Sequence, residues 1–129
     1  GEKDRLSDNN VTITGIMGDV RNRDVIVVDD EIATAGTIAE VVAKMQREYN
    51  IRRVTVVGTH GLFTGPAVDR LNAIDAIDEI LITDTVPLPE DRRPERLKVL
   101  SVARIFGEVI RCNVQGESVG TLFEFWPTS

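Results

Sequence analysis

The residues best suited to chemistry lie in the stretch VIVVDDEIATAGTIAE, residues 25–40, where a loop of small and hydroxyl residues precedes a helical pattern. Gly36 and the small residue Ala35 allow the backbone to turn tightly. The N–H groups at the start of the helix would then be free, and with the positive end of the helix dipole they would form an anion site. Thr34 and Thr37 add hydroxyl donors, so the loop predicts a pocket for a phosphate monoester.

Two adjacent carboxylates, Asp29 and Asp30, precede this loop. Carboxylates beside a phosphate repel it unless they accept hydrogen bonds from vicinal sugar hydroxyls, or hold Mg²⁺ directly or through water. A ribose 5-phosphate satisfies both requirements, with its phosphate in the loop and its 2- and 3-hydroxyls on the two acids. The sequence assigns neither acid firmly as a metal ligand.

A simpler interpretation of the same stretch involves no ligand. Thr37 and Glu40 fit a capping box and could only start a helix, while Asp29 and Asp30 could only be a polar strand end. We favour the binding interpretation because four β-branched residues, the spacing DDxxxTxGT and a helix occur here as one unit. The spacing matches neither GxxxxGK[ST] nor GxGxxG, so neither a nucleoside-triphosphate P-loop nor a dinucleotide fold is indicated.

Alternating strand and helix patterns must position this stretch. Continuous apolar runs predict strands buried on both faces of a parallel sheet, at residues 25–28, 54–58, 79–83 and 97–102. Amphipathic patterns predict helices over about 37–49, from Pro66 and from about residue 103. Residues 11–14 alternate as in an edge strand, and residues 1–10 are polar and expected to be mobile. The pattern predicts an α/β fold, a mostly parallel sheet with helices on both faces.

Ligands bind such sheets at the carboxyl ends of the strands, where the loops 29–37, 59–65 and 83–96 are expected to meet. His60 lies in this region, and no role is assigned to it because a single histidine is more often structural.

Composition limits the function classes. The chain has 129 residues, 42% of them apolar, which suits one domain with a core. A net charge of −6 argues against nucleic-acid binding, and no apolar run approaches the roughly 18 residues of a membrane span. The single cysteine, Cys112, excludes an internal disulfide, so a cytoplasmic location is expected.

The unit DDxxxTxGT resembles the PRPP-binding signature of type I phosphoribosyltransferase folds. The segment GTHGLFTGPAVDRL, residues 58–71, resembles the THGxFSGPAxxRL segment of the ribose-phosphate pyrophosphokinases, or PRPP synthetases. ITDTVPLPED, LKVLSVARIFGEVIRC and GESVGTLF also follow that family in order. The resemblance covers Lys3 to Phe123. It implies that residues 1–129 are a partial C-terminal phosphoribosyltransferase-like domain that lacks the first strand-helix unit and the N-terminal domain.

The resemblance implies a reaction and a binding site. The family transfers the β,γ-diphosphoryl group of ATP to the 1-hydroxyl of ribose 5-phosphate, with Mg²⁺, and yields PRPP and AMP. Asp29 would contact the ribose hydroxyls, with Asp30 beside it. The phosphate loop would comprise Ala33, Thr34, Ala35, Gly36 and Thr37. The family often has Asp where this chain has Ala33.

Lys3 and Arg5, in EKDRL, resemble a catalytic KxR motif of the family, although Asp4 replaces the usual basic middle residue. The resemblance implies that both are catalytic and that Arg5 also contacts ribose 5-phosphate. Charge develops on phosphate oxygens during diphosphoryl transfer, and two cations that close over them would stabilise it. Without the resemblance, these residues would be interpreted as a solvated terminus.

Parts of the family pattern have no counterpart in the sequence, namely the first strand with its diphosphate- and Mg²⁺-handling loop and the ATP-contacting domain. The chain alone is therefore expected to be inactive, and ATP is expected to bind mainly to parts of the family's proteins that this sequence does not contain. The missing strands would leave a sheet edge unpaired, which favours a homo-oligomer. Two alternatives stay open. A type I phosphoribosyltransferase would share DDxxxTxGT but not THGLFTGPAVDRL. A catalytically silent paralogue, regulating true synthetases by co-assembly, would fit Ala33 and Asp4.

Overall fold

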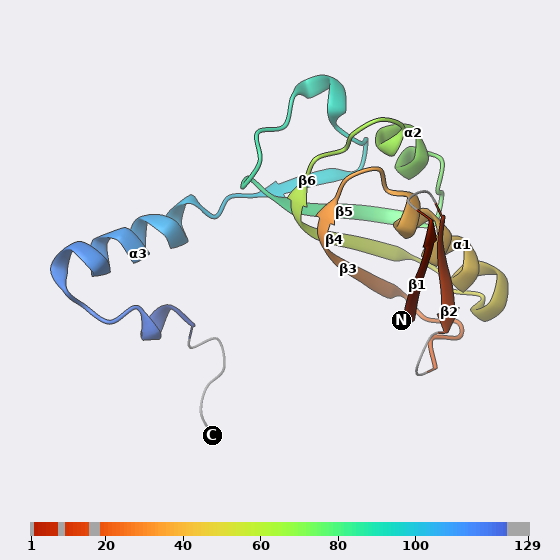
Figure 1. Cartoon of the computed structure of the whole chain (residues 1–129), viewed down its shortest axis with the longest axis horizontal. Coiled ribbons are helices and arrows are strands. Elements are labelled where there is room, and N and C mark those ends of the chain that lie inside the picture. The colour runs from red at the N-terminus through yellow and green to blue at the C-terminus, as the bar shows by residue number, and fades with distance from the viewer. Residues whose placement is uncertain (1, 8–9, 16–18, 124–129) are drawn as a thin grey trace.

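The computed structural model describes residues 2–7, 10–15 and 19–123. Strands β3, β4, β5 and β6 form one parallel sheet in that order, and β1 and β2 form a separate antiparallel pair (Figure 1). In chain order the elements are β1 (Glu2–Ser7), β2 (Asn10–Gly15), β3 (Val25–Ile32), α1 (Gly36–Tyr49), β4 (Val54–Gly61), α2 (Ala67–Asn72), β5 (Ile77–Thr83), the 3₁₀ turn η1 (Glu90–Arg92), β6 (Leu97–Leu100), α3 (Ala103–Gln115) and the 3₁₀ turn η2 (Gly120–Phe123).

The core lies between one face of this sheet and the helices α1 and α2. The predicted stripe of α1 is confirmed, because Ile38, Val42 and Met45 are buried. They join Ala67 and Leu71 of α2 in one apolar cluster with the buried residues of the strands. This cluster fixes α1 and α2 against the sheet, and thereby fixes the loops that precede the two helices.

Strand β3 is longer than the apolar run predicts. It continues through both acids to Ile32, because Asp29 pairs with Gly58 and Ile32 pairs with Gly61 in the parallel ladder. Ile32 is almost fully buried, which holds the strand in the sheet beyond the charged residues. The prediction that the strand stops at the acids is therefore wrong, and the loop between β3 and α1 is only residues 33–35.

The second face of the sheet is open, contrary to the prediction of strands buried on both faces. On β3 the side chains of Ile26 and Val28 are 67% and 73% exposed, whereas Val25 and Val27 pack against the core. In the described part of the chain, α1 and α2 cover the core face, while α3 lies away from the sheet (Figure 1). The expectation of helices on both faces thus holds for one face only.

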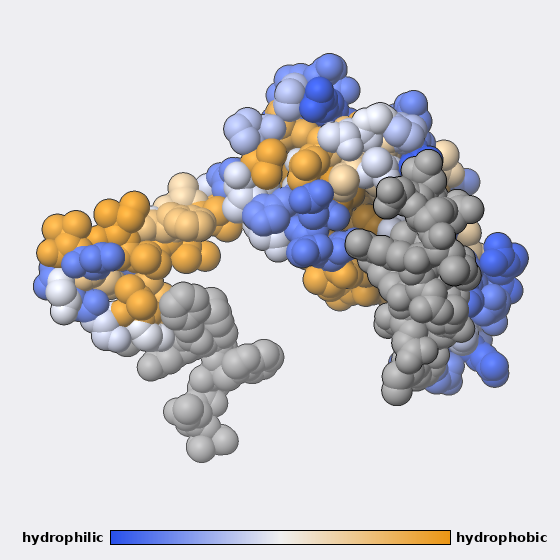
Figure 2. Space-filling view, in the orientation of Figure 1, coloured by the Kyte–Doolittle hydropathy of each residue, from blue (hydrophilic) through white to orange (hydrophobic). Residues whose placement is uncertain are grey.

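Helix α3 carries its apolar residues outward. Ile105, Phe106, Ile110 and Val114 are exposed, Val114 by 81%, and form an apolar surface along the helix (Figure 2). The predicted helix from residue 103 is confirmed, but not its packing on the sheet. Among the described residues, no helix combines the length and apolar character that crossing a bilayer requires.

The strand predicted at residues 11–14 is confirmed as β2. The prediction that residues 1–10 form a mobile tail is wrong for residues 2–7, which form β1. The reason is backbone pairing, because β2 offers an edge and the antiparallel register sets Lys3 opposite Ile13 and Arg5 opposite Val11.

Candidate functional site

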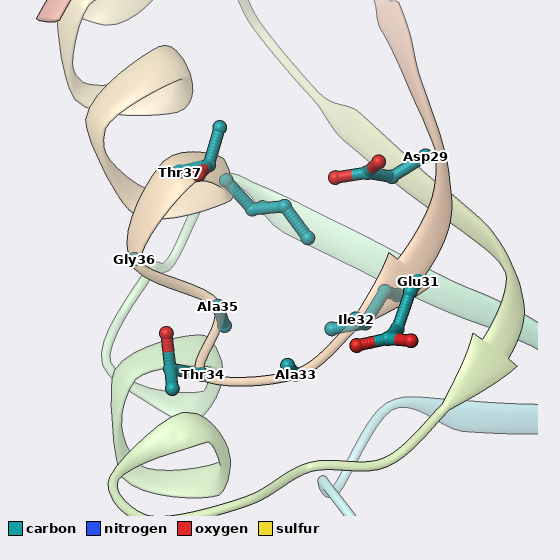
Figure 3. Close-up of a pocket in the computed structure, with 9 residues that line it drawn as sticks. Asp29, Glu31, Ile32, Ala33, Thr34, Ala35, Gly36 and Thr37 are labelled. Carbon is teal, nitrogen blue, oxygen red and sulfur yellow. The ribbon is translucent and has the colours of Figure 1, made fainter. Parts of the chain in front are cut away.

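A pocket is lined by the end of β3, the loop between β3 and α1, and the first turn of α1 (Figure 3). Helix α1 begins at Gly36, with Ala35 as its N-cap, and no side chain caps the first turn. The capping box of the simpler interpretation, Thr37 with Glu40, is not formed, because Thr37 already lies inside the helix. The N–H groups of this helix start therefore lack a side-chain cap and are suited to an anion.

The loop adopts an uncommon backbone conformation. Ala35 has φ 57°, in the left-handed region that residues with a Cβ rarely occupy, and its carbonyl accepts the Ala39 N–H at 3.0 Å. Such a conformation costs on the order of 1–2 kcal/mol and persists only where neighbouring contacts enforce it. The loop shape is thus set by its surroundings and not by the intrinsic preference of alanine.

Those surroundings include the loop that follows β4. The N–H groups of Leu62 and Phe63 donate to the carbonyl of Ile32, at 3.0 and 3.1 Å. The N–H of Thr64 donates to the carbonyl of Ala33 at 2.9 Å. Phe63 is buried, so these donors are fixed by packing in the core. The segment THGLFTG, expected at the same sheet edge, therefore stabilises the β3–α1 loop through these three backbone hydrogen bonds.

The acids at the pocket are Asp29 and Glu31, and not the adjacent pair that the sequence indicates. Both line the pocket, and their carboxylates lie on its strand side, across from the helix start (Figure 3). Asp30 is exposed and belongs to the opposite side of β3, because successive residues of a strand alternate between faces. Its N–H donates to Asp29 Oδ1 at 3.0 Å. The period of two along the strand could have identified Glu31 from the sequence.

The five residues expected in the phosphate loop all line this pocket: Ala33, Thr34, Ala35, Gly36 and Thr37. Lys3 and Arg5 are described only as backbone positions of β1, so the places of their side chains lie outside the described part of the structure. The structure thus brings together the loop and Asp29. It adds Glu31 and sets Asp30 apart.

His60 lies next to this region in the sheet, opposite Glu31 in the parallel register. Its Nδ1 is 2.7 Å from the hydroxyl of Thr85, and that hydroxyl donates to the carbonyl of Thr59 at 3.2 Å. These contacts connect the carboxyl ends of β4 and β5. They agree with a structural use of His60.

A divalent cation fits this pocket only with oxygens from a ligand. In the described residues no three His, Cys, Asp or Glu side chains come together as a metal site. Asp29 and Glu31 nevertheless offer carboxylate oxygens, and Mg²⁺ is commonly held by one or two carboxylates with water and substrate phosphates completing its shell. The donor set therefore fits Mg²⁺ that arrives with a phosphorylated ligand.

Comparison with known proteins gives consistent matches. A sequence model of the phosphoribosyl synthetase-associated domain matches residues 6–124. The ribose-phosphate pyrophosphokinase of Bifidobacterium longum is 42% identical over 125 residues, which are 97% of this chain and 36% of that protein. That of Synechococcus elongatus is 37% identical over 122 residues, 95% of this chain and 37% of that protein.

The crystal structure of the phosphoribosylpyrophosphate synthetase from Mycobacterium smegmatis has a similar fold, with a TM-score of 0.72 at 37% identity. The match covers 78% of this chain and 33% of that one. The predicted α/β fold with a parallel sheet is thereby confirmed. The chain spans less than half the length of the relatives that it matches.

Proposed function

The chain belongs to the phosphoribosyl synthetase-associated family, and from this premise we propose that it is a segment of a ribose-phosphate pyrophosphokinase, within the C-terminal domain, that binds ribose 5-phosphate. One observation carries the proposal. An uncapped helix start and the carboxylates of Asp29 and Glu31 face each other across one pocket. This arrangement suits a ligand with an anion at one end and hydroxyls at the other.

The 5-phosphate would accept hydrogen bonds from the N–H groups at the start of α1 and from the Thr34 and Thr37 hydroxyls. Asp29 would accept hydrogen bonds from the ribose hydroxyls. Two separate attachments fix the orientation of the sugar, and therefore the direction of its 1-hydroxyl, before any reaction begins.

In the proposed reaction, the 1-hydroxyl oxygen forms a bond to the β-phosphorus of ATP. The bond between that phosphorus and the oxygen bridging to the α-phosphate breaks, AMP leaves, and the hydroxyl proton is released. Lys3 and Arg5 are the proposed catalytic cations, because both carry positive charge suited to the transferring phosphate oxygens. Mg²⁺, when bound with the substrates, would offset negative charge on the diphosphoryl group.

Titration calorimetry with ribose 5-phosphate, in the presence of Mg²⁺, tests the binding site. We expect Asp29→Asn to weaken binding by about tenfold, or about 1.4 kcal/mol, because the neutral side chain is a poorer acceptor for sugar hydroxyls. Asp75→Asn is the matched control, since this exposed acid lies in the turn before β5, at the amino end of the strands and away from the pocket. Equal affinities of wild type and Asp29→Asn, or no binding by either, would overturn the proposal.

A second candidate is a catalytically silent member of the family that regulates true synthetases by co-assembly. Ala33 favours it, because the family signature often has an acid at this pocket position. The two candidates differ in one measurement. The complete protein that contains this segment releases AMP from ATP and ribose 5-phosphate if it is an enzyme, and does not if it is silent. Binding of ribose 5-phosphate is compatible with both.

A further inference from the structure

A cation from a different βα unit contacts the phosphate loop. Arg70, on α2, donates from Nη1 to the backbone carbonyl of Thr34 at 3.0 Å. The same nitrogen lies close to the first residue of α1, because a Cβ added at Gly36 would be 3.4 Å from it. The guanidinium of Arg70 therefore contacts the loop from outside the pocket, whose lining does not include this residue.

We propose that Arg70 is a positioning residue for the phosphate loop, an inference that rests on the ribose 5-phosphate site proposed above. The peptide between Thr34 and Ala35 is trans, as are all the described peptide bonds. In a planar trans peptide the carbonyl and the next N–H point in opposite directions. By holding the Thr34 carbonyl, Arg70 turns the Ala35 N–H away from α2, toward the phosphate.

The strained backbone at Ala35 requires a contact of this kind, which fixes the orientation of the peptide between Thr34 and Ala35. A left-handed alanine relaxes unless its neighbours fix it, and the backbone contact from Thr64 fixes only the residue two positions earlier, Ala33. The Thr34 carbonyl is the next attachment point along the loop, and Arg70 occupies it. The loop is thus held from two sides, by the segment after β4 and by α2.

Charge is the second part of the role. Within the described chain, the Arg70 guanidinium forms no ion pair with a carboxylate, and its one side-chain hydrogen bond is to an uncharged carbonyl. Its positive charge is therefore available to the pocket, where Asp29 and Glu31 contribute two negative charges. A cation near the loop offsets part of their repulsion of a phosphate dianion.

Variants at Arg70 test this role in the full chain. We expect Arg70→Met to weaken ribose 5-phosphate binding by about tenfold in calorimetry, and Arg70→Lys to recover about half of that loss in logarithmic terms. Lysine keeps the charge but lacks the rigid planar donor group. The matched control is Arg47→Met, which removes an exposed arginine from the last turn of α1, at the far end from the loop. If Arg70→Met and Arg47→Met bind ribose 5-phosphate with equal affinity, the inference is overturned.

An amide NMR spectrum separates positioning from general destabilisation without any ligand. In Arg70→Met we expect the Ala35 and Gly36 amide resonances to move and their hydrogens to exchange faster. The amides of Val54 and Val56, in the core strand β4, should stay as in wild type. Unchanged loop amides would contradict the positioning role. If wild type binds no ribose 5-phosphate, the proposed function fails while this spectrum still decides whether Arg70 orients the loop.

Discussion

Asp29 and Glu31 share one side of β3, and both face the helix start across the pocket. A carboxylate two residues along the strand has the same direction, whereas its immediate neighbour has the opposite one. The carboxylates at the pocket are therefore an alternate pair, and not the adjacent pair that the sequence indicates. Asp30, with Ile26 and Val28, belongs to the exposed face.

This difference gives a prediction about which acid contacts the sugar. We expect Glu31→Gln to weaken ribose 5-phosphate binding about fivefold, because the neutral side chain accepts a weaker hydrogen bond. Asp30→Asn should change the affinity by less than about twofold, since Asp30 lies on the other side of the strand. Calorimetry on both variants decides the matter. A larger loss for Asp30→Asn would restore the adjacent pair as the sugar-binding acids.

At the scale of single elements, the end of β4 packs closely against its neighbours. A Cβ added at Gly61 would lie 2.5 Å from Ile82 Cδ1 and 2.7 Å from Phe63 Cε2. Both neighbours are almost fully buried and have little room to move. Phe63 also belongs to the segment that supports the phosphate loop, so packing at this glycine and the shape of the pocket are connected.

We therefore predict that Gly61→Ala lowers the free energy of unfolding by about 1–3 kcal/mol, since an added methyl group overpacks the core. Urea unfolding followed by circular dichroism measures the change. The matched control is Gly107→Ala in α3, where a Cβ would meet nothing within 4 Å. That variant should be neutral or stabilising by up to about 1 kcal/mol, as for alanine in a helix. A Gly61→Ala protein as stable as wild type would contradict the packing argument.

Asp84 fixes the start of α3 relative to the sheet. Its backbone N–H donates to the Leu100 carbonyl at 3.2 Å, and its carboxylate accepts the Val102 N–H at 2.8 Å. Hydrogen bonds from Ser101 and from the Val102 N–H hold the pKa of the Asp84 carboxyl below its ordinary value. A lowered pKa means that the stabilisation is present above the unfolded-state pKa and is lost as the pH falls through the folded-state pKa.

The pH dependence that follows is small but specific. We expect Asp84→Asn to lower the melting temperature at pH 7. The difference from wild type should shrink as the pH falls below about 4, where the wild-type carboxyl also becomes neutral. Calorimetric melting at several pH values measures this. A difference that stays constant across the acid range would show that the charge of Asp84 has no part in the effect.

Local patterns predicted most elements, and longer-range partners account for the differences. The stripe of α1 is periodic over four turns, so Ile38 and Met45 could be placed on the core face from the sequence. The continuation of β3 to Ile32 depends on its pairing with β4. The sequence does not indicate this continuation, because the charged residues Asp29 and Asp30 interrupt the apolar pattern of the strand. The uncapped start of α1 was predicted from loop composition. Its left-handed Ala35 was not, because only contacts from distant segments enforce that conformation.

On the scale of the whole molecule, the apolar run of β3 could not reveal that one face of the sheet is open. The apolar run VIVV would look the same in the sequence whether helices pack on both faces of the sheet or on one face only. The answer depends on where α3 lies, and α3 is separated from β6 by only two residues, Ser101 and Val102. Its apolar surface is directed to solvent and not to the sheet.

The open face and the edge strand predict self-association. β3 is an edge of the described sheet and exposes Ile26 and Val28. Unpaired edges and apolar patches favour contact between copies. We expect the mass from light scattering to rise above that of a monomer with increasing concentration. Val28→Lys should shift this rise to about tenfold higher concentration. A strictly monomeric particle at high concentration would contradict the prediction.

The exposed apolar residues of the sheet and α3 also affect how folding can be judged. Dyes such as anilinonaphthalene sulfonate fluoresce on exposed apolar surface and are commonly used to detect molten globules. The folded chain presents such surface on β3 and along α3 while its core residues are close-packed. Bright fluorescence with this dye would therefore be compatible with a fully folded sample. Cooperative unfolding is the criterion that distinguishes a native preparation of this protein from a collapsed one.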